Sequence, residues 1–244
     1  MILMLKKRLW LFLRPIILKS PQLSCLLNKK YFGLNELDKK LVKYIDFDNG
    51  YFVELGANDG VTQSNTKHLE LYRKWRGILI EPSPKQFYQL KKLRSKRNFL
   101  FNCACVSEDF PSATIELMYS NLMSITLEGQ NDIPDRISHA KSGEIHSDKE
   151  QVFRFHAQAR TLQSIFVETS SPRMIDLLSL DVEGGELEVL KGIDFSATNF
   201  QFILIETRSI EEIRKFLLLR NYKEVEKLSH HDYLFAFDSN HSLV

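Results

Sequence analysis

The chain has 244 residues, 43% of them hydrophobic and 26% charged, with ten glycines and seven prolines. This length and composition indicate a globular protein of one domain, or of one domain with an appendage, that can bury a large core without disulfides. The net charge of +2 gives no overall reason to expect a nucleic acid as partner. Cys103 and Cys105 lie in an apolar run, so we interpret them as buried free thiols in a reducing, cytoplasmic compartment.

Positive charge is concentrated at the N-terminus. Residues 1–40 hold nine Lys or Arg against Glu36 and Asp38, a surplus of seven that leaves −5 for the rest of the chain. Residues 1–20 are apolar and basic, but their longest apolar run, Leu9–Leu13, is far shorter than the ~20 residues that span a bilayer. Two interpretations stay open for them. One is a helix lying peripherally on an anionic membrane, and the other is a helix packed on the domain or on a second copy in a homo-oligomer.

We divide the chain into a basic and apolar helical appendage over 1–48 and a domain over 49–244. The domain opens with short apolar runs, typical of buried strands, that alternate with apolar residues at three- and four-residue steps, typical of helices. In chain order the first half is expected to contain a helix over 33–48, a strand over 51–55, a helix over 64–75 capped by Ser64, a strand over 77–80, a helix from Pro84 and a strand over 99–106.

Residues 107–160 interrupt this alternation. Strand-like patterns occur at Thr114–Tyr119 and at Val152–Phe155, with a long polar stretch between them. A connection of this length is usually functional, so we expect a lid or a substrate-facing insertion. Its histidines have no metal-ligand spacing and are expected at the solvated surface: His139, His146 and His156.

The alternation resumes after the insertion. In chain order we expect a helix over 162–167, a strand over 175–180, a short helix over 187–190, a strand over 200–205, a helix over 210–217 and two strands over 222–228 and 233–237. The last two are joined by a short turn, which predicts an antiparallel hairpin. A parallel sheet that ends in such a hairpin favours a methyltransferase over a dinucleotide-dependent dehydrogenase.

The loop after the first strand indicates the ligand. It has the spacing Gly56-x-x-x-Gly60 and lacks the third glycine of a pyrophosphate-binding loop. Carboxylates flank it, Glu54 before and Asp59 within, and these suit a cationic ligand such as S-adenosylmethionine (SAM). Glu81 ends the next strand, about where an acid holds the ribose hydroxyls in nucleotide-binding α/β folds.

A second acidic stretch follows the strand over 175–180. Glu186 and Glu188 would lie in the first turn of a helix, where acids are stabilised by the helix dipole. Asp181 and Glu183 have no such explanation, because clustered acids destabilise a fold unless they have partners. We therefore predict that these two are catalytic, with Asp181 the first choice as general base and Glu183 the second.

The sequences FVELGANDG, SNT, ILIEPSP and LLSLDVEGGELEVLKG occur in the order and spacing of FkbM-type methyltransferases, which the chain resembles over roughly residues 50–207. The resemblance implies a doubly wound, seven-stranded, mostly parallel Rossmann-like α/β sheet with a terminal antiparallel hairpin. It also implies methyl transfer from SAM to oxygen, often to a hydroxyl of a sugar, glycan or related natural product.

The resemblance also implies positions for the cofactor. It places Glu54, Gly56, Asn58 and Gly60 around the methionine part of SAM. It places Glu81 at the ribose, Ala104 and Cys105 near the adenine, and Asp181 and Glu183 at the transferable methyl. The further cofactor-binding candidates adjoin these motifs: Ala57, Asp59, Asn65, Pro82 and Ser83.

Three alternatives remain at this point. A divalent cation held by Asp181 and Glu183 would polarise the acceptor hydroxyl, although no third ligand can be named. The domain would otherwise be an inactive methyltransferase-like module at a membrane surface. An NAD-dependent oxidoreductase is disfavoured by the loop and by the hairpin.

Overall fold

The computed structural model describes residues 13, 15–19, 30–142 and 152–238. Residues 1–20, for which a helix on a membrane was one interpretation, lie largely outside the described residues. His146 also lies outside them. Within the described part of the chain, no helix has the length and apolar character needed to cross a membrane.

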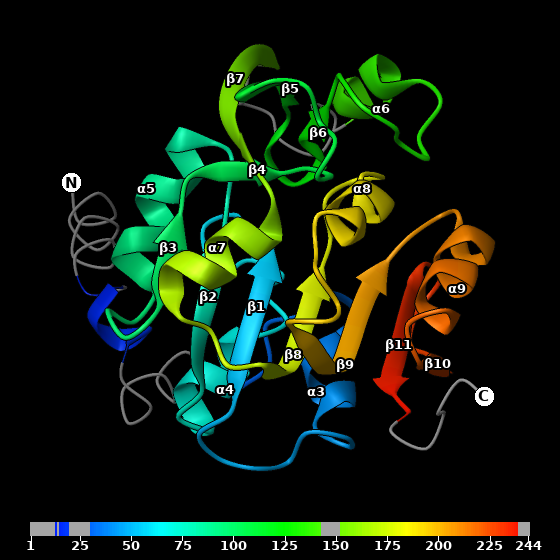
Figure 1. Ribbon diagram of the computed structural model, residues 1–244. Coiled ribbons are helices and arrows are strands. Elements are labelled where there is room, and N and C mark those ends of the chain that lie inside the picture. The colour runs from blue at the N-terminus through cyan, green and yellow to red at the C-terminus, as the bar shows by residue number, and fades with distance from the viewer. Residues whose placement is uncertain (1–12, 14, 20–29, 143–151, 239–244) are drawn as a thin grey trace, which may run out of the picture.

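A seven-stranded sheet forms the centre of the domain (Figure 1), in the order β10-β11-β9-β8-β1-β2-β3. Its strands are β1 (Tyr51–Leu55), β2 (Arg76–Ile80), β3 (Phe99–Phe101), β8 (Met174–Leu180), β9 (Asn199–Glu206), β10 (Tyr222–Lys227) and β11 (Asp232–Phe237). All pairs among β1, β2, β3, β8 and β9 are parallel, whereas β11 runs antiparallel to both β9 and β10. The predicted mostly parallel sheet with a terminal hairpin is therefore confirmed.

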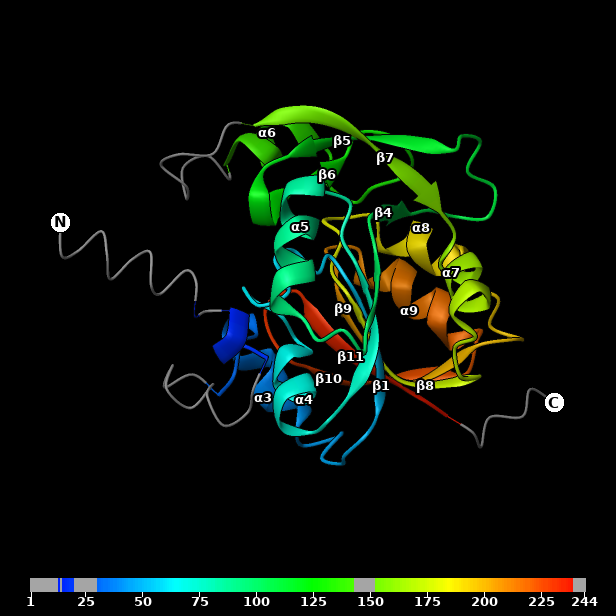
Figure 2. The ribbon, with the colours of Figure 1, turned by 90° about the vertical axis from the view of Figure 1, so that its left-hand side faces the viewer.

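Helices cover both faces of this sheet (Figure 2). One face carries α3 (Leu37–Leu41), α4 (Lys67–Tyr72) and α5 (Pro84–Leu93), and the other carries α7 (Leu162–Thr169), α8 (Glu186–Lys191) and α9 (Ile210–Leu218). In β8, Leu178 packs in the core under α7, α8 and α9, and Leu177 packs in the core under α3, α4 and α5. Burial on both faces explains why the central strands appear in the sequence as continuous apolar runs.

Two expected elements differ from those in the structure. The helix expected over 33–48 is reduced to η2 (Leu34–Glu36) and α3, because Asn35 and Glu36 take left-handed backbone angles between them. The single strand expected over 99–106 is divided at Asn102, whose side-chain amide donates to the carbonyl oxygens of Glu81 (2.8 Å) and Pro82 (2.9 Å). The chain leaves the large sheet at this point.

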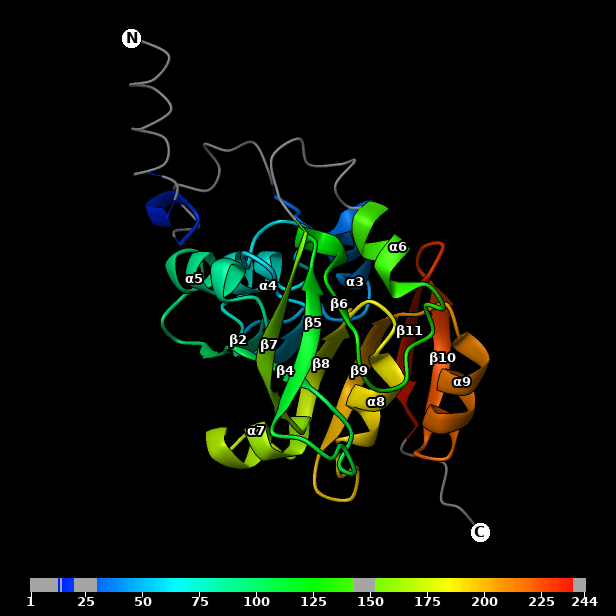
Figure 3. The same ribbon diagram turned by 90° about the horizontal axis from the view of Figure 1, so that it is seen from above.

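The region over 107–160 builds a second sheet instead of an open loop. Together with β4 (Cys103–Cys105) it has the order β4-β7-β5-β6, from β5 (Thr114–Tyr119), β6 (Ile125–Thr126) and β7 (Phe153–Arg160). It also contains η3 (Asn121–Met123) and α6 (Arg136–Ser142). This small sheet and α6 lie beyond the carboxyl ends of β1, β8 and β9 (Figures 1 and 3). The insertion thus faces the edge at which open α/β sheets bind ligands.

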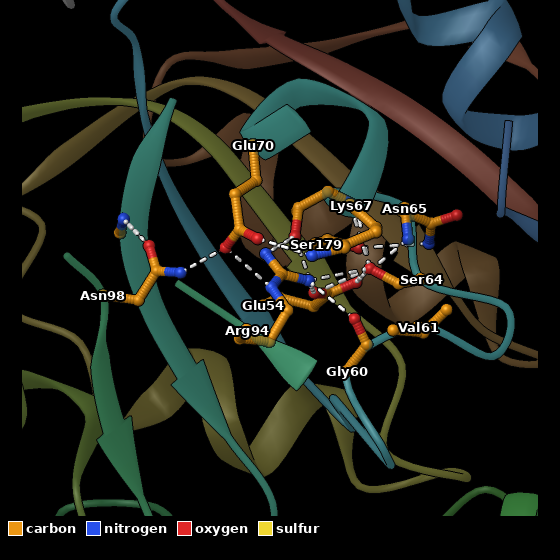
Figure 4. Close-up of polar contacts among 12 residues, drawn as sticks. Glu54, Gly60, Val61, Ser64, Asn65, Lys67, Glu70, Arg94, Asn98 and Ser179 are labelled. Atoms are coloured by element: carbon orange, nitrogen blue, oxygen red, sulfur yellow. Dashed lines mark hydrogen bonds and ion pairs between the residues drawn. The ribbon is translucent and has the colours of Figure 1, made fainter. Parts of the chain in front are cut away.

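A buried cluster of two cations and two acids lies beneath the β1–α4 loop (Figure 4). The Arg94 guanidinium donates from Nε to Glu70 (2.9 Å) and from Nη1 to Glu54 (3.2 Å) and to the carbonyl oxygen of Gly60 (3.1 Å). Lys67 pairs with Glu70 at 2.6 Å. The side chains of these four charged residues are at most 5% exposed, so each acid depends on its cation.

The same cluster orders the start of α4. Glu54 accepts hydrogen bonds from the Ser64 hydroxyl (2.9 Å), the Asn65 backbone N–H (2.9 Å) and the Thr66 hydroxyl (2.6 Å). The Ser64 hydroxyl oxygen in turn accepts from the Lys67 N–H at 3.1 Å. The helix itself begins only at Lys67 with Thr66 as its N-cap, so the predicted start at Ser64 is wrong by three residues.

The ionisation of the cluster follows from these contacts. Burial alone would raise the pKa of Glu70, but Arg94 and Lys67 outweigh it and lower that pKa to about 2. Burial lowers the pKa of Lys67 to about 8, which leaves the amine charged at neutral pH. Both acids therefore face cations at pH 7.

We predict that Arg94→Met lowers the free energy of unfolding by ~3–5 kcal/mol, because it leaves Glu54 uncompensated and weakens the pairing of Glu70. Urea unfolding followed by circular dichroism measures this loss. Arg97→Met, at an exposed position on the same segment, is the matched control and should change stability by less than ~0.5 kcal/mol. A loss below ~1 kcal/mol for Arg94→Met would show that the cluster is not a stabilising element.

Candidate active site

The β1–α4 loop passes close to the β8–α8 turn. Gly56 has φ +72°, and a Cβ atom there would lie 1.9 Å from the backbone oxygen of Asp181. Only glycine fits both the left-handed angle and this approach. Further along the loop, the Asp59 carboxylate accepts the N–H groups of Val61 (2.8 Å) and Thr62 (2.7 Å). The loop is thus held from within, and its backbone lines the crevice.

Glu81, at the end of β2, is buried beside this loop. One carboxylate oxygen accepts the N–H of Asn58 and the other accepts the N–H of Ser83, both at 2.8 Å. Burial raises the pKa of Glu81 to about 7, and the two N–H groups only partly offset that rise. The Ser83 hydroxyl caps α5 by accepting from Gln86 N–H.

The β8–α8 turn is organised around the buried Glu186. Its Oε1 accepts the N–H groups of Val182 (3.1 Å) and Gly184 (3.0 Å). Glu186 lies in the first turn of α8, as the sequence pattern predicted, and its carboxyl group also closes the turn that precedes the helix. Burial raises the pKa of Glu186 to about 8. Glu183, within the turn, has φ 56°, a left-handed angle that costs a residue with a side chain ~1–2 kcal/mol.

Asp181 and Glu206 form a carboxyl pair at the ends of β8 and β9. Burial raises the pKa of Asp181 well above its usual value, and the charges of Glu206 and Glu183 add to the rise. Burial likewise raises the pKa of Glu206 to about 7. The expected repulsion among these acids is therefore present. Among the charged neighbours of Asp181, Glu206 raises its pKa most, and the sequence analysis did not single out Glu206.

His139, on α6 of the insertion, reaches the same turn. Its Nε2 lies 2.8 Å from Oε2 of Glu183, and the two side chains are only 11% and 15% exposed. Arg208, after β9, places Nη1 3.9 Å from the same carboxylate oxygen. The prediction that His139 lies at the solvated surface is therefore wrong, whereas His156 is exposed, as predicted. No local pattern signalled this contact, because it joins segments 44 positions apart.

These groups surround a cavity of about 490 Å³. It is lined by eight of the residues predicted to form the site: Gly56, Asn58, Glu81, Pro82, Ala104, Cys105, Asp181 and Glu183. Its lining also includes His139, Glu206 and Arg208, which the sequence analysis did not predict as site residues. The other predicted cofactor-binding residues are not among its lining: Glu54, Ala57, Asp59, Gly60, Asn65 and Ser83.

The residues behind the cavity have structural partners. The Glu54 carboxylate belongs to the Arg94 cluster, and the Asn65 amide donates to the Ser179 hydroxyl at 3.1 Å. Gly60 has φ +81°, and a Cβ atom there would lie 2.6 Å from the Arg94 side chain. Cys103 and Cys105 are free thiols, Cys103 buried and Cys105 partly buried. Among the described residues, no group of three or more His, Cys, Asp or Glu is arranged to hold a metal ion.

The fold and the position of this cavity are those of a Rossmann-like methyltransferase. A sequence model of the methyltransferase FkbM domain matches residues 54–233. The chain therefore belongs to the FkbM methyltransferase family and is a SAM-dependent methyltransferase. No protein with a curated description matches the sequence.

Solved structures of other methyltransferases are similar in fold. Methyltransferase FkbM from Methylobacillus flagellatus KT is 16% identical with a TM-score of 0.43, over 78% of this chain and 44% of that one. TrmK of M. capricolum, solved in complex with S-adenosyl-homocysteine, is 12% identical with a TM-score of 0.39, over 82% and 65%. Precorrin-6y C5,15-methyltransferase from Geobacter metallireducens GS-15 is 14% identical with a TM-score of 0.38, over 84% and 88%. At these values no substrate is inferred from them.

The residues present fit SAM. The cavity volume lies within the ~300–1,000 Å³ typical of small-molecule sites. Bare backbone at Gly56 allows close approach, and the acids at both ends would be favoured in their ionised form by the sulfonium and ammonium of the cofactor.

We predict that the free energy of unfolding of the ligand-free protein falls as pH rises from about 4.5 to 8. Glu81, Glu206 and Glu186 have raised pKa values, so the folded state retains protons that the unfolded chain has lost. Their stabilisation is complete below pH ~4.5 and disappears as each deprotonates. Glu186→Gln should reduce the slope by at most ~1.4 kcal/mol per pH unit, measured by urea unfolding at pH 5, 6, 7 and 8.

The exposed Glu212→Gln is the control, and its slope should match that of the wild type. The difference between variant and wild type removes the contributions of all other groups. Equal slopes for Glu186→Gln and Glu212→Gln would contradict the assignment of a retained proton to Glu186.

Proposed function

We propose that the protein transfers the methyl group of SAM to a hydroxyl oxygen of a sugar, glycan or related natural-product acceptor. The observation that carries this proposal is a single cavity with Glu81 at the end of β2 and Asp181 at the end of β8. Where the β8–α8 turn meets α6, its lining includes the polar side chains of Glu183 and His139, and Arg208 also lines it. Such a mixture of hydrogen-bond donors and acceptors suits a polyhydroxylated acceptor.

In this proposal the cofactor is oriented by the β1–α4 loop and by the two acids that follow strands at the cavity, Glu81 and Asp181. Glu81 holds the ribose hydroxyls, and the backbone at Gly56 and Asn58 lies against the methionine part. Ala104 and Cys105, on β4, adjoin the adenine. The predicted residues behind the cavity act by fixing the loop, as the contacts of Glu54 with the Arg94 cluster support.

The chemistry requires alignment and proton removal. When bound, SAM supplies a methyl carbon that is already activated by its sulfonium. In this proposal the Asp181 carboxylate accepts a hydrogen bond from the acceptor hydroxyl and directs its oxygen toward that carbon. A sulfonium nearby would lower the raised pKa of Asp181 and so favour its ionised form. Alignment of two reactants contributes up to ~7–11 kcal/mol.

We predict that Glu81→Ala weakens SAM binding by ~1.5–3 kcal/mol, about 10- to 150-fold in Kd, because a charged hydrogen-bond acceptor for the ribose is lost. Titration calorimetry measures the change. Glu128→Ala removes a carboxylate that lines the insertion side of the cavity, and it should leave the Kd within about threefold. NAD is the ligand control and should not bind. Unchanged SAM affinity in folded Glu81→Ala would remove the ribose assignment.

We also predict that Asp181→Asn retains SAM binding within about tenfold but lowers turnover by at least ~100-fold, because a small misplacement of the reacting oxygen has an effect of that size. Turnover is measured as transfer of tritium from [methyl-³H]SAM to a panel of methyl glycosides of hexoses and 6-deoxyhexoses. Wild-type rates in this variant would exclude Asp181 from the reaction. An active wild type is the positive control, and methylation of no glycoside would contradict the acceptor class.

A further inference from the structure

The contact between His139 and Glu183 joins the insertion to the Asp181–Glu186 turn inside the cavity. The 2.8 Å separation is that of a hydrogen bond, and both side chains line the cavity while exposing little surface. Only Nε2 of His139 has a partner among the described residues, so Nδ1 of this cavity-lining residue is left to accept a proton. An imidazole with one nitrogen held by a carboxylate and the other free is the arrangement of a general base.

Glu183 is directed at His139 by its backbone. Its left-handed φ of 56° is held by the hydrogen bonds of Val182 and Gly184 to Glu186 on either side. Residues that persist in such strained conformations cluster at functional sites.

The insertion is anchored to the same turn by other contacts. The Asn131 side chain donates to the backbone oxygen of Glu183 (2.9 Å), and the Asp132 N–H donates to the oxygen of Gly184 (2.9 Å). The Asp132 carboxylate accepts the N–H groups of Arg208 (2.8 Å) and Ser209 (3.0 Å). These bonds fix the insertion without His139. A purely structural role for the imidazole is therefore redundant.

We propose that His139 is the general base of the methyl transfer and that Glu183 is its positioning residue. This inference rests on the proposed function and replaces Asp181 as the proton acceptor. The acceptor hydroxyl oxygen forms a bond to the methyl carbon while the carbon–sulfur bond breaks and its electron pair stays on sulfur, which becomes the neutral thioether. The hydroxyl proton passes to Nδ1 of His139, and the imidazolium is stabilised by Glu183 until solvent takes the proton.

The surroundings favour His139 over Asp181 in this role. Asp181 is engaged by a hydrogen bond with Glu206, whereas Nδ1 of His139 has no partner among the described residues, so Asp181 is better suited to hold the hydroxyl than to deprotonate it. The charged group in contact with His139 is Glu183, and Arg208 lies 3.9 Å from the same carboxylate oxygen; Asp181 and Glu206 line the same cavity. On its own segment the exposed charges are Asp135 and Lys141.

The first experiment needs no acceptor. Protein labelled with ¹⁵N-histidine and saturated with S-adenosylhomocysteine is examined by NMR at pH 8, with His139 assigned by the signals that are missing in His139→Gln. We expect the proton on Nε2 and the lone pair on Nδ1 in the wild type. In Glu183→Gln the amide group can donate to Nε2, so a substantial fraction should carry the proton on Nδ1 instead. A wild-type His139 protonated mainly on Nδ1 would overturn the proposal.

The second experiment measures methyl transfer from SAM to the methyl glycoside panel. His139→Gln should lower kcat by ~100- to 10,000-fold with SAM affinity within threefold, and Glu183→Gln should lower it by at least ~100-fold. Added imidazole should partly restore His139→Gly.

Asn131→Ala is the matched control, because it removes another bond between the insertion and residue 183 while leaving the imidazole intact. Its kcat should fall by less than ~10-fold. Glycoside methylation by His139→Gln within threefold of the wild type would overturn the base assignment and leave the proposed function standing, as would an equal loss in Asn131→Ala. The expected tautomer without methylation of any glycoside would instead remove the acceptor class and leave the base assignment standing.

Discussion

The pairing of Arg94 with Glu54 and Glu70 is the interaction on which the site depends. The guanidinium also bonds the Gly60 carbonyl, so it ties the end of the β1–α4 loop to α5. From there the loop carries the constraint to Asn58, whose N–H bonds Glu81 at the cavity. A buried ion pair of this kind adds little to stability against an apolar alternative, but breaking one partner is costly. Its specific contribution here is therefore a defined loop conformation.

The buried acids beneath the β1–α4 loop and those inside the cavity differ in whether a cation pairs with them. Beneath the loop, Arg94 and Lys67 lie directly against carboxylates and keep the pKa of Glu70 low. Inside the cavity, Asp181 and Glu206 form no ion pair within the described part of the chain, and burial raises the pKa of both. Arg208 lies 3.9 Å from Glu183, and its charge offsets only part of the rise at Glu206. A cation that enters the cavity would therefore favour the ionised form of these carboxyl groups.

Much of the large sheet could be predicted from the sequence because its signals are local. The central strands are buried on both faces and appear as apolar runs, and the turns after β1 and β8 carry glycines whose left-handed angles only glycine adopts easily. The division at Asn102 could not be predicted, because the apolar pattern continues across it. The hydrogen bonds that mark it run from the Asn102 side chain to the backbone of Glu81 and Pro82, which follow β2.

The candidate site could be predicted only where its residues have local signals. Glu81 and Asp181 follow strands directly, so their places at the cavity follow from topology. The roles of Glu54 and Glu186 did not follow, because a carboxylate that caps backbone N–H groups and one that faces a ligand are the same residue type at nearly the same position. Contacts of the insertion, such as His139 with Glu183, depend on docking between segments remote in sequence.

That docking has a consequence for how the acceptor can be recognised. Asn131 and Asp132 bond the backbone of Glu183 and Gly184, so these two contacts of the insertion depend on the shape of the turn, whereas His139 contacts the Glu183 side chain. Glu186 closes that turn from within, independently of the insertion. At the far side of the crevice, Asn121 of η3 accepts from the amides of Asn58 (3.2 Å) and Gln86 (3.0 Å). With both ends of the insertion attached in this way, we propose that the surface between them can vary in sequence, and with it the acceptor, without altering how the cofactor is held.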